Sequence, residues 1–125
     1  MRLPVQNTAL HMAVAFVLMG GWAILANRGH PLPQALLAGC VQGCLSALIT
    51  LGLKRMLEAL SRHLQGPAAL VMPPLLALGA SALLLSVIHS LAGTPEILST
   101  IIVPLLVTTV YSASYTFALW SRRNA

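Results

Sequence analysis

Hydrophobic residues along this chain form four long segments separated by short polar stretches. The segments cover residues 8–27, 33–54, 73–92 and 95–120. A helix rises about 1.5 Å per residue, so about 20 apolar residues cross a hydrocarbon layer roughly 30 Å thick. The pattern predicts an all-α, polytopic membrane protein in which four transmembrane helices form one domain over residues 1–125.

The polar stretches predict how these helices are joined into two hairpins. Residues 27–33 contain a glycine and two prolines, which favour a tight connection. The second helix is expected to continue to residue 64 as a cytoplasmic amphipathic segment, because Glu58 lies four residues from both Lys54 and Arg62. We expect Gln65, Gly66 and Pro67 to end it.

Prolines suggest where the last two helices begin. The third is expected to start at Pro73 or Pro74, since the first turn of a helix tolerates proline. The fourth is expected to start with Thr94 as N-cap and Pro95 as the first helical residue.

Composition excludes a soluble globular domain. Hydrophobic residues make up 58% of the chain, charged residues only 7%, and the mean hydropathy is +0.86. So few charges cannot cover the surface of a soluble fold. We expect no nucleic-acid partner, because the basic residues flank apolar segments instead of forming a stripe with aromatic residues.

The distribution of basic residues predicts an orientation. Apart from Arg28, they lie at three places: Arg2, then Lys54, Arg55 and Arg62, then Arg122 and Arg123. Since Lys and Arg are retained on the cytoplasmic side, we expect both termini in the cytoplasm of a bacterial inner membrane. The predicted contacts with anionic lipid are Lys54, Arg55, Arg62, Arg122 and Arg123.

The two halves of the chain resemble each other weakly. Gly29, His30 and Pro31 match Gly93, Thr94 and Pro95 at the expected hairpin tips. Such matches indicate either a parallel repeat of two helices or chance, because small residues are common in membrane helices.

One face of the second helix carries small and polar residues. Its members are Gly39, Gln42, Gly43, Ser46 and Thr50. Small residues let helix backbones approach closely, and the polar ones can hydrogen-bond across the contact. This face could pack against another helix of the same chain, mediate homo-oligomerisation, or contribute Gln42 to a polar pathway.

The fourth helix has a second polar face. Thr100, Thr108, Tyr111 and Tyr115 fall on one side of it together with Pro104. These residues could pack in the interior, or they could line a small cavity or contact a lipid headgroup. Pro104 leaves a carbonyl that neighbouring groups must satisfy.

Few residues in the sequence are candidates for catalysis, proton transfer or metal binding. His89 is a candidate near-surface proton site and His11 a weaker one, whereas Glu58 and Glu96 are expected to have structural roles. Cys40 and Cys44 project outward from one helix, so we expect neither a disulfide nor a metal site, and no cofactor.

These features favour a non-enzymatic function. The leading hypothesis is an oligomerising or accessory membrane subunit that binds partner helices or anionic lipids, either as a homodimer or with a partner membrane protein. The alternative is a passive channel or small-solute transporter working as a homodimer through the Thr100–Tyr115 face with Gln42. A third hypothesis is a lipid-modifying enzyme that uses His89 or Glu58.

Overall fold

The computed structural model describes the backbone of residues 4–124 and the side chains of residues 8–124. It contains the helices α1 (Pro4–Ala26), α2 (Leu32–His63), α3 (Pro67–Ala92) and α4 (Ile97–Arg123). All four are long and apolar enough to cross a membrane. The predicted all-α membrane fold is therefore confirmed. Arg2 lies outside the described residues.

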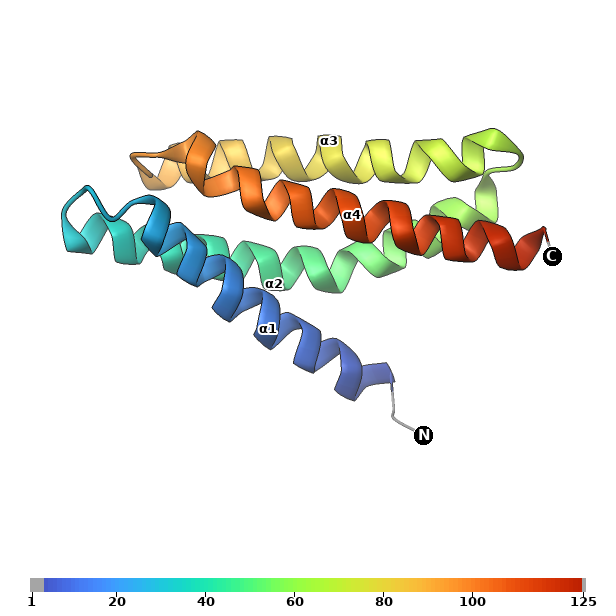
Figure 1. The fold of residues 1–125 in the computed structure, drawn as a ribbon, viewed down its shortest axis with the longest axis horizontal. Helices are drawn as coiled ribbons and strands as arrows, with labels where there is room; N and C mark the ends of the chain where they lie inside the picture. Colours follow the sequence, from blue (N-terminus) through green and yellow to red (C-terminus); the bar gives the residue numbers. More distant parts are fainter. Residues whose placement is uncertain (1–3, 125) are drawn as a thin grey trace.

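Three helices run side by side, and the fourth diverges from them. Figure 1 shows α2, α3 and α4 aligned along the long axis, whereas α1 crosses α2 and its N-terminal part points away from the bundle. Within the described residues α1 packs on α2, touches α4 and has no contact with α3. One flank of α1 is therefore uncovered by the rest of the chain.

The two ends of the bundle differ in charge. Loops 27–31 and 93–96 lie together at one end, which we call the hairpin end (Figure 1). Residues 64–66 and the C-terminus lie at the other, which we call the basic end because it carries Lys54, Arg55, Arg62, Arg122 and Arg123. There, Arg123 Nη1 donates to the carbonyls of Ser61 and Leu64, which ties the last turn of α4 to the end of α2.

Two helix starts differ from expectation. Helix α3 begins at Pro67, so Pro73 and Pro74 lie inside it. Gly66 precedes it with φ +64°, a conformation that glycine adopts without steric cost. Helix α4 begins at Ile97 with Glu96 as N-cap. The prediction for Thr94 is wrong because its hydroxyl bonds to the His89 side chain and its N–H to the His89 carbonyl.

The core lies between α2, α3 and α4. One apolar cluster contains Leu45, Leu85 and Ile101, and a second contains Leu53, Leu57 and Ala77. Since lipid tails are as apolar as these side chains, close packing and interhelical hydrogen bonds hold such a bundle together.

Glycines bring α1 and α2 into backbone contact. A Cβ atom added at Gly20 would lie 2.9 Å from the Gly39 carbonyl oxygen, and one at Gly43 would lie 3.0 Å from the Phe16 carbonyl oxygen. Cys40 and Cys44 are exposed free thiols on another side of α2.

Candidate functional site

A buried polar chain links α2 to α3 near the hairpin end. The His89 and Gln42 side chains are both 0% exposed, and His89 Nε2 lies 2.8 Å from Gln42 Oε1. Because an amide oxygen only accepts, Nε2 carries the proton. In the neutral ring, Nδ1 then accepts from the Thr94 hydroxyl at 2.7 Å. Gln42 Nε2 donates onward to Ser46 Oγ at 2.7 Å.

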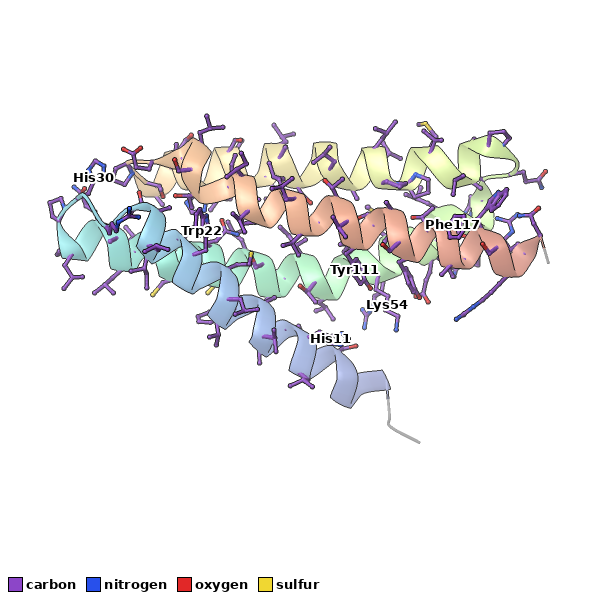
Figure 2. The ribbon with its side chains drawn as sticks, in the orientation of Figure 1. His11, Trp22, His30, Lys54, Tyr111 and Phe117 are labelled. Atoms are coloured by element: carbon purple, nitrogen blue, oxygen red, sulfur yellow. The ribbon has the colours of Figure 1, made fainter. Side chains whose placement is uncertain are left out.

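This arrangement gives both ring nitrogens of His89 a partner inside the protein. The candidate near-surface proton site is thus placed in the interior, where it bridges two helices and the 93–96 loop. His11, the weaker candidate, is exposed on α1 (Figure 2).

A second buried polar cluster joins the two hairpin loops. Asn27, which is 0% exposed, donates through Nδ2 to the Ala23 carbonyl and to Thr100 Oγ1, both at 2.8 Å. Its Oδ1 accepts from the backbone N–H of Glu96 at 3.0 Å. Asn27 was missed from sequence because its partners lie about 70 positions away and no local spacing connects them.

Beside this cluster is a hollow of about 520 Å³ between α1 and the start of α4, with a mainly apolar lining that includes a few charged and polar groups. We call it the hairpin-end hollow, and Trp22, Ala26, Arg28, Gly29, His30, Glu96, Ser99 and Ile102 line it. His30 Nε2 donates to Glu96 Oε2 at 2.9 Å, and Trp22 Nε1 donates to the Ser99 carbonyl at 2.9 Å. Trp22 and His30 lie at the same end of the bundle in Figure 2.

The predicted polar face of α4 is divided in the structure. Thr100 and Thr108 are buried, whereas Tyr111 is 39% exposed and stacks on half-buried Tyr115 with ring centroids 5.8 Å apart. The Tyr115 hydroxyl donates to Glu58 Oε2 at 2.9 Å.

Ser112 and Thr116 lie on the same buried side of α4 as Thr100 and Thr108, but they were not among the site residues predicted from the sequence. Ser112 and Thr116 are fully buried, and neither hydroxyl has a hydrogen-bond partner among the residues that the structure describes. On the exposed side, a largely apolar hollow of about 530 Å³ is lined by Leu106, Val107, Val110, Tyr111 and Ser114.

The small-residue face of α2 divides between two neighbours. Gly39 and Gly43 lie against α1, whereas Gln42 contacts His89 of α3 and donates to Ser46. The Thr50 hydroxyl donates within α2, to the Ser46 carbonyl at 2.8 Å.

The basic end carries a concentration of exposed charge. The side chains of Lys54, Arg55, Arg62, Arg122 and Arg123 are all exposed. Glu58 is the acidic residue among them, and it is engaged by Tyr115. Figure 2 shows Lys54 and Tyr111 on the same side of the bundle.

Among the residues described, no group of three or more His, Cys, Asp or Glu side chains is arranged to hold a metal ion. Comparisons of the chain with protein-family models, with curated proteins and with solved structures find no match.

Proposed function

We propose that this chain is a non-enzymatic membrane protein that binds an anionic phospholipid at its basic end. The observation that carries the proposal is the unbalanced charge there. The basic end has five exposed basic side chains and one carboxylate, that of Glu58. Its formal charge is therefore five minus one, or +4. Basic residues at a membrane surface attract anionic lipid, with about 1 kcal/mol contributed by each Lys or Arg.

The cations come from two adjacent helix ends. Lys54, Arg55 and Arg62 lie on the last part of α2, and Arg122 and Arg123 lie on the last turn of α4. Contact of Arg123 with Ser61 and Leu64 holds these helix ends together. A phosphate between them would receive donors from both helices, and arginine can bind it in a bidentate manner.

The surface next to these cations suits an acyl chain. The apolar hollow on α4 includes Val107 and Val110, and Tyr111 stands at its edge. Helix α1 diverges from the bundle on its way towards the basic end and leaves this region open (Figure 1). By the positive-inside rule, the lipid belongs to the cytoplasmic leaflet of a bacterial inner membrane.

The test is lipid retention by the purified protein. We expect native mass spectrometry to show retention of phosphatidylglycerol over phosphatidylcholine, and the double variant Lys54→Gln/Arg55→Gln to weaken phosphatidylglycerol binding by about thirtyfold. Arg28→Gln, which removes one cation at the opposite end, should cause a smaller loss than the double variant. Equal loss in Arg28→Gln and in the double variant, or no loss in either, overturns the proposal.

A second candidate is favoured by the uncovered flank of α1. Within the described residues α1 has no contact with α3, and its Val14 and Val17 are exposed. A partner transmembrane helix could pack there. The test uses a background in which Cys40→Ser and Cys44→Ser remove the native thiols. In it, Val17→Cys should form crosslinks to a partner within the membrane, whereas Leu83→Cys on α3 should not. Crosslinking at both positions, or at neither, removes this candidate.

A further inference from the structure

The hairpin-end hollow is a second site with charged side chains, at the opposite end of the molecule from the proposed anionic-lipid site. It collects opposite charges in one place: Arg28 and His30 come from the α1–α2 loop, and Glu96 comes from the α3–α4 loop. The cluster of Asn27, Thr100 and the Glu96 backbone holds the two loops together. Buried contacts therefore fix how the two loops lie relative to each other.

Part of the hydrogen-bonding capacity in this hollow is used within the protein. Arg28 Nη1 donates to the Leu25 carbonyl at 2.9 Å, and a guanidinium has four further N–H donors. Glu96 accepts from His30 through Oε2, and its side chain is 47% exposed. The hollow thus offers donors for an anion and a carboxylate for a cation, side by side.

The depth of the hollow matches that of lipid headgroups. It lies where α1 ends and α4 begins, at the end of membrane-spanning helices. Trp22 lines it, and tryptophan is enriched at the boundary between headgroups and hydrocarbon. Ile102 also lines the hollow, and exposed Leu106 and Val110 continue the same side of α4 at four-residue spacing.

We propose that the hairpin-end hollow binds the headgroup of a phosphatidylethanolamine-type lipid. Arg28 donates to the phosphate, Glu96 accepts from the primary ammonium, and an acyl chain follows Ile102, Leu106 and Val110 along α4. This inference does not rest on the proposed function, because the two headgroup sites share no charged residue; the two proposals have only the apolar residues Leu106 and Val110 of α4 in common.

The chemistry distinguishes this lipid from others. A phosphatidylcholine headgroup has a trimethylated nitrogen, which has no N–H to donate to Glu96. Phosphatidylglycerol has no cation for Glu96 at all, and its net negative charge would lie beside that carboxylate. Preference for phosphatidylethanolamine over both is therefore the signature of the site.

The fluorescence of Trp22 can report lipid binding in the hollow. In a Trp120→Phe background Trp22 is the sole tryptophan, and it lines the hollow. In proteoliposomes we expect phosphatidylethanolamine with brominated acyl chains to quench its fluorescence more than brominated phosphatidylcholine or phosphatidylglycerol at equal mole fraction. Glu96→Gln should reduce this preference by about threefold, the effect of one exposed charged contact. Arg28→Gln should instead weaken quenching by all three lipids, because each of them has a phosphate. His63→Gln, at the basic end, should leave the preference unchanged.

Several results would overturn the proposal. Equal quenching by the three lipids removes the headgroup preference, and an unchanged preference in folded Glu96→Gln removes the role of the carboxylate. If soluble glycerophosphoethanolamine at millimolar concentration abolishes the preference, the hollow takes a water-soluble zwitterion and the assignment to a lipid is wrong. Circular dichroism and gel filtration check folding, and if Arg28→Gln does not fold, Glu96→Gln alone decides.

Discussion

Three buried polar side chains, Asn27, Gln42 and His89, connect parts of the chain that are distant in sequence. Helical periodicity identified Gln42 as part of a polar face, and the scarcity of ionisable residues drew attention to His89. Their hydrogen bond to each other could not be predicted, because periodicity gives the face of a helix but not which helix lies opposite. The partner of Gln42 is 47 residues away.

The first prediction concerns this pair. Gln42→Leu should destabilise the protein by about 1–2 kcal/mol, because it leaves the Nε2–H of buried His89 without an acceptor. Ser112→Ala should change stability by less than about 0.5 kcal/mol, since the Ser112 hydroxyl has no partner to lose. Unfolding in mixed micelles, followed by circular dichroism, measures both. A larger loss for Ser112→Ala than for Gln42→Leu would contradict the pairing.

At the scale of whole helices, α1 is held by a close backbone approach to α2. The glycines responsible are Gly20, Gly39 and Gly43. The sequence indicated a small-residue face on α2 and left open whether it contacts its own chain or a second copy. In the structure Gly39 and Gly43 lie against α1. Gly20 could not be assigned a partner beforehand, because one helix alone does not indicate which of its small residues is approached.

Neighbouring glycines on α1 give a matched test of this contact. Gly20→Ala should cost about 1–3 kcal/mol, because its Cβ would lie 2.9 Å from the Gly39 carbonyl oxygen and backbone must shift to relieve the overlap. Gly21→Ala should be neutral or slightly stabilising, since nothing lies within 4 Å of the added atom and alanine favours helix. The same unfolding assay applies, and equal effects at the two positions would argue against this packing.

The starts predicted for the third and fourth helices were wrong. The preference of proline for the first turn placed the third helix at Pro73 or Pro74, but α3 begins at Pro67 and contains both. In a membrane bundle neighbouring groups can satisfy the carbonyls that a proline leaves free, so the preference is not a rule there. The prediction for Thr94 was wrong because its hydroxyl bonds to His89, five residues earlier, instead of capping α4.

For the molecule as a whole, the number and length of the hydrophobic segments predicted the fold, because crossing a bilayer requires this pattern. Sites within the bundle depend on tertiary neighbours and were not predictable in the same way. Tyr111 and Tyr115, for example, share a face with Thr100 by periodicity, yet Thr100 is buried and Tyr111 is exposed. Thr100 is buried at the hairpin end, where it accepts a hydrogen bond from Asn27, whereas Tyr111 borders the exposed hollow on α4.

The overall charge distribution predicts a topology. Reporter fusions after residues 65 and 125 should both be active in the cytoplasm, because the basic end carries Lys54, Arg55, Arg62, Arg122 and Arg123. A reporter inserted after residue 29 should be active on the opposite side. Alkaline phosphatase and green fluorescent protein fusions measure the two sides. Phosphatase activity at residue 65 or 125 would show that the orientation is reversed.

The contact between Asn27 and Thr100 has a consequence for how the chain is made. During synthesis α1 and α2 emerge from the ribosome well before α4, so the Asn27 amide spends that interval without the Thr100 hydroxyl and the Glu96 N–H that it binds in the finished protein. Only the arrival of the last helix completes its hydrogen bonding. A nascent chain stalled before residue 96 therefore leaves the Asn27 amide open to water at the hairpin end, a feature by which an incomplete product differs from a complete one.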